Sequence, residues 1–266
     1  MTERVLLEIR NDIAYVTLNR PDKYNGLDMA LFQGLTRTAK QLRKDRNIRA
    51  VILQGAGPAF CSGLDVKGVS ANPLNFARLL VKPGRRISNL AQEVGYLWRQ
   101  VPAPVIAVTH GVCFGGGLQI ALGADFRYTT PDCRFSIMEA KWGLIPDMSL
   151  TVTLSELMPI DQAKALTMTA RQFDGHEALS LGVVTRVCED PLAQAEAFVD
   201  SLREKSPDAV AASKLLFNQA WKADDKKALA LESSLQKKVL GRVNQRIALA
   251  RNGSEPDKPF QPRRPF

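Results

Sequence analysis

A strand–strand–helix pattern that occurs twice along the chain places the strongest constraint on its fold. Residues 3–19 predict a β-hairpin, because apolar side chains take alternate positions before and after the turn Asn11-Asp12. Asp28 then suits the N-cap of a helix whose apolar residues follow helical spacing up to Leu42. A short apolar run at 50–54 predicts a buried strand after this helix.

The second copy of the pattern contains a glycine-rich turn. The apolar run 105–108 predicts a strand, and the stretch 115–122 that follows the turn predicts the start of a helix. Two more strands are expected at 125–128 and 134–137, on either side of a turn at 130–132. Units of this kind cannot bury both faces of their strands without neighbouring units, so the chain is expected to be an α/β protein built as a spiral of ββα units.

Helical spacing replaces this pattern from residue 191 onward. A break is expected at Ser206-Pro207, followed by two more helices, the second at about 224–250. The tail, residues 252–266, is rich in Pro, Arg and Lys and has no core pattern, so we expect it to be extended and to lie along another surface. The chain is therefore divided into a spiral core, residues 1–190, and a C-terminal helical region, residues 191–266.

The charge of the chain is strongly basic, with 36 Lys and Arg against 27 Asp and Glu and a formal net charge of +9. Such a charge fits a solvated basic surface, a ligand that carries several phosphate groups, or nucleic acid. The basic clusters at 78–86 and 237–264 lack the interleaved aromatic residues of a face that binds single strands. Nucleic acid is therefore the least favoured partner.

Cysteine and histidine usage gives no sign of a metal site. The four cysteines are widely spaced and there are only two histidines, so we expect neither a metal nor a disulfide framework. The N-terminus runs directly into the first predicted strand and has no signal sequence. The longest apolar runs are far shorter than the roughly 20 residues that cross a bilayer. These features predict a cytoplasmic protein without a membrane-spanning segment.

Two loops and two carboxylates carry a resemblance to a known family. The loops are Phe60-Cys61-Ser62-Gly63-Leu64-Asp65 and His110-Gly111-Val112-Cys113-Phe114-Gly115-Gly116-Gly117-Leu118-Gln119, and Glu139 and Asp147 follow them. With Phe173-x-x-x-Glu177-Ala178-Leu179-x-x-Gly182-Val183-Val184 downstream, residues 3–250 resemble the crotonase superfamily, which is the enoyl-CoA hydratase/isomerase family. The resemblance implies a crotonase-like spiral, an acyl-CoA thioester substrate with no further cofactor, and a homotrimer or hexamer held by the C-terminal helices.

The resemblance also implies an oxyanion hole, which is a pair of backbone N–H groups that bind the thioester oxygen. On this sequence the two amides match Leu64 and Gly116. Removal of a proton beside a thioester places negative charge on that oxygen, and preorganised donors stabilise it. The neighbouring residues that the resemblance adds as substrate-binding are Ser62, Gly63, Asp65 and Gln119.

Glu139 and Asp147 are the candidate catalytic carboxylates. Glu139 matches the acid/base glutamate of the family, and its apolar neighbours would favour proton exchange near neutral pH. Asp147 resembles the second carboxylate of the dienoyl-CoA isomerase branch. Two alternatives stay open for it: a cap of a helix at 149–157, or the nucleophile of the chlorobenzoyl-CoA dehalogenase branch.

Gln119 is the point at which the sequence departs from the family pattern. Hydratases have a glutamate at this position and dienoyl isomerases have an aspartate, whereas an amide cannot accept a proton as a base. We therefore predict an acyl-CoA double-bond isomerase. The alternatives are an enoyl-CoA hydratase in which Gln119 only positions water, an acyl-CoA hydrolase or dehalogenase that uses Asp147, and a non-catalytic RNA-binding scaffold. The segment 66–97 is expected to line the pocket for the acyl chain.

Overall fold

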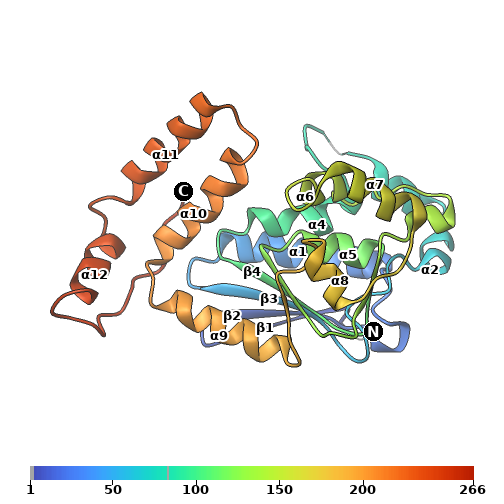
Figure 1. Cartoon of the computed structure of the whole chain (residues 1–266), viewed down its shortest axis with the longest axis horizontal. Helices are drawn as coiled ribbons and strands as arrows, with labels where there is room; N and C mark the ends of the chain where they lie inside the picture. The colour runs from blue at the N-terminus through green and yellow to red at the C-terminus, as the bar shows by residue number, and fades with distance from the viewer. Residues whose placement is uncertain (1–2, 83) are drawn as a thin grey trace.

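A six-stranded sheet lies at the centre of the molecule (Figure 1). The computed structural model describes residues 3–82 and 84–266. The first two strands pair antiparallel, as the hairpin prediction requires, and every other neighbouring pair is parallel. In their order across the sheet the strands are β1 (Val5–Arg10), β2 (Ile13–Leu18), β3 (Ala50–Gly55), β4 (Val105–Thr109), β6 (Phe126–Thr129) and β8 (Arg186–Val187).

A second, two-stranded sheet contains β5 (Val112–Phe114) and β7 (Arg134–Ser136), which pair in parallel. The two strands expected around the turn at 130–132 are therefore present, but they belong to different sheets. β6 pairs with β4, and β7 pairs with β5. From β4 onward the chain adds strands to the two sheets alternately, as the predicted spiral requires.

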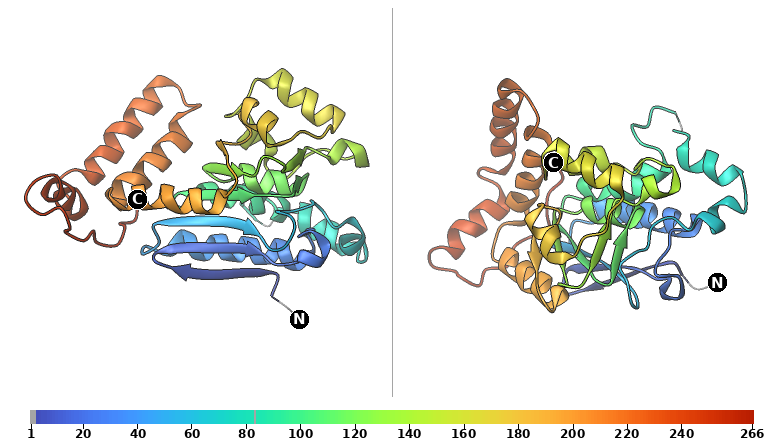
Figure 2. Two further views of the ribbon diagram at one scale, coloured as in Figure 1. Left: turned by 60° about the horizontal axis from the view of Figure 1, so that its bottom comes forward. Right: turned by 45° about the vertical axis from the view of Figure 1, so that its right-hand side comes forward.

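Helices cover both faces of the large sheet (Figure 2). One cluster of buried side chains joins one face to α1, α4 and α5, and a second joins the other face to α9. Alternate residues of β2 face opposite clusters, as expected for a sheet buried on both sides. The helices are α1 (Met29–Lys44), α2 (Val66–Ser70), α3 (Leu74–Leu80), α4 (Leu90–Gln100), α5 (Gly116–Leu122), α6 (Leu150–Leu154), α7 (Ile160–Thr169), α8 (Gly175–Ser180), α9 (Pro191–Arg203), α10 (Pro207–Ala220), α11 (Asp225–Val239) and α12 (Val243–Arg251), with short 3-10 turns η1 (Pro21–Lys23) and η2 (Glu139–Trp142).

Side-chain caps, one expected at Asp28 and one at the expected break Ser206-Pro207, explain where two of these helices begin. The Asp28 side chain accepts a hydrogen bond from the N–H of Leu31 at the start of α1, and Ser206 does the same for Ala209 at the start of α10. The long helix expected at 224–250 is wrong, because the chain breaks between α11 and α12. Gly241 has φ of +71° at this break, a left-handed conformation that interrupts a helix.

The last helices leave the body of the molecule. α10 and α11 pack against each other, and α11 and α12 lie farthest from the sheet, at the left of Figure 1. The tail after α12 is extended, as expected, and returns along surfaces of this same chain. Its Arg263 is 4% exposed and its backbone N–H bonds to the carbonyl of Arg46. The N–H of Arg264 bonds to the carboxylate of Asp208.

Candidate active site

A cavity of about 500 Å³ brings together most of the residues that the sequence singles out. The loop after β3, the start of α5, η2 and the segment before α6 all contribute to its wall. The predicted site residues that line it are Ser62, Gly63, Leu64, Asp65, Gly116, Glu139 and Asp147. Gln119 lies outside it.

Leu64 lines this cavity, and hydrogen bonds hold its backbone in place. On the two sides of Leu64, the carbonyl of Gly63 accepts from the N–H of Leu27, and the N–H of Asp65 donates to the carbonyl of Leu27. These two bonds fix the peptide units around Leu64, and its own N–H has no acceptor within residues 3–82 and 84–266. A donor without a protein partner is available to a ligand.

The amide of Gly116 lies beside the first loop. Gly116 is the first residue of α5, where helical N–H groups have no intrahelical acceptor. A Cβ atom on Gly63 would lie 3.6 Å from the nitrogen of Gly116, so the two loops are in close contact. Gly63 (φ +93°) and Gly115 (φ +49°) both adopt conformations that favour glycine. This backbone places two N–H groups that have no acceptor among the described residues in the wall of the cavity.

Glu139 is held by Gln119 through one of its two oxygens. Gln119 Nε2 donates to Glu139 Oε1 at 2.6 Å, and Gln119 Oε1 accepts from the N–H of Met148 at 2.9 Å. The second bond fixes which end of the amide faces Glu139. Gln119 is fully buried and contacts Glu139, and the substrate contact expected from the sequence stays a prediction.

The other oxygen of Glu139, Oε2, is buried and has no hydrogen-bond partner among the described residues. Burial raises the pKa of Glu139, and repulsion from Asp147 raises it further, while the hydrogen bond from Gln119 acts in the opposite direction. A carboxylate with these properties exchanges protons closer to neutral pH than a solvated glutamate does.

Asp147 lines the same cavity and is not a helix cap. The N-cap position of α6 is Ser149, and no side chain caps this helix. The capping alternative for Asp147 is therefore wrong. Removal from water by the surrounding residues raises the pKa of Asp147. No hydrogen bond from its carboxylate to another described residue is present.

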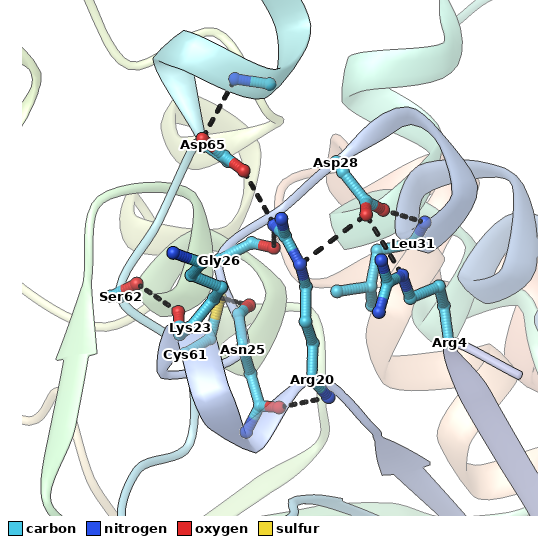
Figure 3. A network of polar contacts seen from close by, with 11 residues as sticks. Arg4, Arg20, Lys23, Asn25, Gly26, Asp28, Leu31, Cys61, Ser62 and Asp65 are labelled. Atoms are coloured by element: carbon cyan, nitrogen blue, oxygen red, sulfur yellow. Dashed lines mark hydrogen bonds and ion pairs between the residues drawn. The ribbon is translucent and has the colours of Figure 1, made fainter. Parts of the chain in front are cut away.

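Arg20 is a residue that sequence analysis missed (Figure 3). Its guanidinium Nη1 donates to the carbonyl of Gly26 at 2.9 Å and to Asp65 Oδ2 at 2.7 Å. Its Nε lies 3.6 Å from Asp28 Oδ2. Asp65 also accepts from the N–H of Gly68, and this bond, together with Arg20, lowers the pKa of Asp65. Arg20 is one of 36 Lys and Arg residues, and no motif in the sequence distinguishes it from the others.

The described part of the chain contains no group of three or more side chains placed to hold a metal ion. No described helix has the length and apolar character that a bilayer-spanning helix requires.

Comparisons with known proteins agree with this geometry. The family model for enoyl-CoA hydratase/isomerase matches residues 8–250. The mitochondrial Delta(3,5)-Delta(2,4)-dienoyl-CoA isomerase of Rattus norvegicus is 33% identical over 217 residues, which cover 76% of this chain and 64% of that enzyme. The chain thus spans less than two thirds of that relative's length. The short-chain-enoyl-CoA hydratase of Clostridium acetobutylicum is 31% identical over 232 residues, 86% of each chain.

The fold has the same relatives. The crystal structure of an enoyl-CoA hydratase from Bacillus anthracis superposes with a TM-score of 0.86 at 25% identity, covering 97% of this chain and 98% of that one. A spiral α/β fold whose glycine-rich turns present backbone amides to a carboxylate-lined cavity defines a crotonase-type enzyme. The chain belongs to the enoyl-CoA hydratase/isomerase family.

Proposed function

We propose that this enzyme is an acyl-CoA double-bond isomerase in which Glu139 moves a proton along a β,γ-unsaturated thioester. The amides of Leu64 and Gly116 form the oxyanion hole. The observation that supports this role best is the asymmetry of Glu139: Gln119 holds one oxygen, and the other has no partner beside a cavity lined by both free amides.

The reaction begins with transfer of a proton from the carbon next to the thioester carbonyl to Glu139. The electron pair of that C–H bond forms an enolate, whose charge on oxygen is stabilised by the N–H groups of Leu64 and Gly116. One such donor contributes about 3 kcal/mol to transition-state stabilisation. Glu139 then returns the proton to the γ carbon, the double bond moves to the α,β position, and the carboxylate is regenerated.

A coenzyme A thioester is the proposed form of the substrate. Both relatives act, by their names, on CoA esters. Arg20, Lys23 and Lys67 line the same cavity as the free amides, and Lys23 and Lys67 are exposed to solvent. Cations at the mouth of the cavity suit the phosphate groups of coenzyme A.

The contacts of Gln119 favour isomerisation over hydration. Its carbonyl oxygen accepts from Met148 and its amino group donates to Glu139, so the amide offers no basic atom to a water molecule. Hydratases carry a glutamate at both positions, 119 and 139. In this chain only Glu139 is a carboxylate, so hydration would have to rely on it alone.

Glu139→Gln tests the proposal directly. This change keeps the shape of the side chain and removes its basicity, so we expect isomerisation of 3-enoyl-CoA esters to fall by about 10²-fold or more. Binding of a saturated acyl-CoA should be retained. Absorbance assays on a panel of 2-enoyl-, 3-enoyl- and 3,5-dienoyl-CoA esters measure the rates, with the exposed Glu232→Gln as a matched control. Near-native turnover by Glu139→Gln on every ester would refute the mechanism.

A dienoyl-CoA isomerase that uses Asp147 as a second proton carrier is the second candidate. The cavity position of Asp147 and its raised pKa favour it. Asp147→Asn should then slow the 1,5 shift of a 3,5-dienoyl-CoA by at least about tenfold more than the 1,3 shift of a 3-enoyl-CoA, because only the longer transfer needs a group at the distal carbon. Equal effects on the two rates would leave Glu139 as the only catalytic carboxylate. An acyl adduct on Asp147 in mass spectrometry would instead indicate the hydrolase or dehalogenase alternative.

A further inference from the structure

A second cavity, of about 480 Å³, adjoins the first at Asp147. The two cavities share Ile145 and Asp147 as lining residues. The start of α4 and the first turn of α6 supply most of the remaining wall. An acyl chain whose carbonyl lies between the amides of Leu64 and Gly116 would pass Asp147 and enter this second cavity.

The wall of the second cavity carries an unusual number of polar side chains for a hydrocarbon pocket. Those side chains are Ser88, Gln92, Tyr96, Asp147, Ser149 and Thr151. Ile87, Leu150 and Val152 supply apolar surface between them. A ligand that fills this cavity therefore needs both an apolar body and a group that forms hydrogen bonds.

Several of these polar groups have no protein partner. The hydroxyl of Tyr96, which lines the cavity, makes no hydrogen bond within residues 3–82 and 84–266. Ser149 Oγ is buried and exposes no surface to the cavity. Gln92 uses its Oε1 to accept from the N–H of Asn89 in the capping box of α4, so its amino group stays available. A purely hydrocarbon ligand would displace water from these polar groups and leave them without a hydrogen bond. The cost of this loss disfavours such a ligand.

The charge of the cavity wall indicates which kind of polar group the ligand carries. None of the described residues that line this cavity is Lys, Arg or His. An anionic acyl end would meet the carboxylate of Asp147 with no cation to balance it. The neutral hydroxyl and amide groups of Tyr96 and Gln92 match an uncharged partner that donates and accepts hydrogen bonds.

We infer that the natural substrate carries a hydroxyl group on the distal part of its acyl chain, and that Tyr96 and Gln92 in the second cavity bind it. This inference rests on the proposed function for the site of the reaction and extends it to the class of acyl group. A site built around a hydroxyl discriminates strongly against the analogue that lacks it.

The test compares two series of 3-enoyl-CoA esters of increasing chain length, one ending in a methyl group and one in a hydroxyl. At the best chain length, the kcat/KM of the native enzyme should be at least about tenfold higher for the hydroxyl ester. Tyr96→Phe should reduce this preference about fivefold or more, because it removes only the hydroxyl. Ser149→Gly should leave the preference unchanged, because Ser149 Oγ has no surface on the cavity, and φ of +75° at Ser149 suits glycine, so the fold should be kept. Tyr15→Phe is the matched control, since the Tyr15 hydroxyl bonds to Glu196 and lines neither cavity.

A binding measurement separates this inference from the proposed reaction. Saturated hydroxyacyl-CoA and acyl-CoA esters cannot react, and calorimetry should show the same preference in Kd. If no ester of either series is isomerised but the preference in Kd persists and Tyr96→Phe removes it, the proposed function fails and the inference stands. If methyl esters are isomerised and bound as well as hydroxyl esters, the inference is overturned and the proposed function stands.

Discussion

At the scale of single residues, the hydrogen bonds of Gln119 set both the orientation and the protonation of Glu139. The N–H of Met148 fixes the amide, and the amide in turn donates to Glu139. A donor to a carboxylate stabilises its charged form, so this contact opposes the rise in pKa that burial causes. Gln119 is therefore a positioning residue in the proposed mechanism, although it does not touch the cavity.

Gln119→Met should move the acid limb of the pH profile of kcat/KM to higher pH. Glu139 must be ionised to accept a proton, and loss of the donor raises its pKa further, so activity is lost at a higher pH as the medium is acidified. The measurement is isomerisation of a 3-enoyl-CoA across pH, with the exposed Gln172→Met as control. An unshifted acid limb with a reduced rate would mean that Gln119 acts only on geometry.

At the scale of elements, Arg20 joins three segments that are distant in the sequence. It follows β2, bonds to the carbonyl of Gly26 before α1, and bonds to Asp65 before α2. The same loops fix the amide of Leu64 through Leu27. The guanidinium is largely buried, with 11% of its side chain exposed, so these bonds are shielded from water.

Arg20→Met should lower both stability and turnover. Loss of charge-assisted hydrogen bonds to partly buried acceptors should reduce the free energy of unfolding by about 1–3 kcal/mol, measured by urea denaturation. Looser support for the amide of Leu64 should lower kcat about tenfold. Arg4→Met is the matched control, because Arg4 contacts Asp28 at 3.0 Å and does not contact Gly26 or Asp65. The same kcat in both variants would show that Arg20 does not support the oxyanion hole.

At the scale of the whole molecule, the C-terminal helices expose large apolar side chains. Trp221, Leu229 and Leu249 are 65%, 60% and 65% exposed, on or directly after α10, on α11 and on α12. Phe217 lies beside Trp221 with ring centroids 5.7 Å apart. Apolar surface of this extent on projecting helices is typical of a protein interface.

The native chain should sediment as a trimer or a pair of trimers at micromolar concentration, in multiples of three of the 29.3 kDa chain. The double variant Phe217→Ser, Trp221→Ser should shift the distribution toward monomer, because it removes the aromatic pair from the exposed face. A native chain that stays monomeric would contradict this prediction.

Sequence alone determined the local features of this protein. Alternating apolar residues predicted the hairpin, Asp28 predicted the start of α1, and the glycine-rich turn predicted the start of α5. Each of these depends on contacts between residues near each other in the chain, such as the bond from the N–H of Leu31 to Asp28. Such contacts can be predicted because the sequence contains both partners side by side.

Only the tertiary structure decided which of these features come into contact. The sequence placed Gln119 against the substrate, but its partners are Glu139 and Met148, twenty and twenty-nine residues away. It also treated β6 and β7 as strands around one turn, although each pairs with a strand from an earlier part of the spiral. The direction of a buried side chain depends on which elements pack around it, and no local pattern in the sequence specifies that packing.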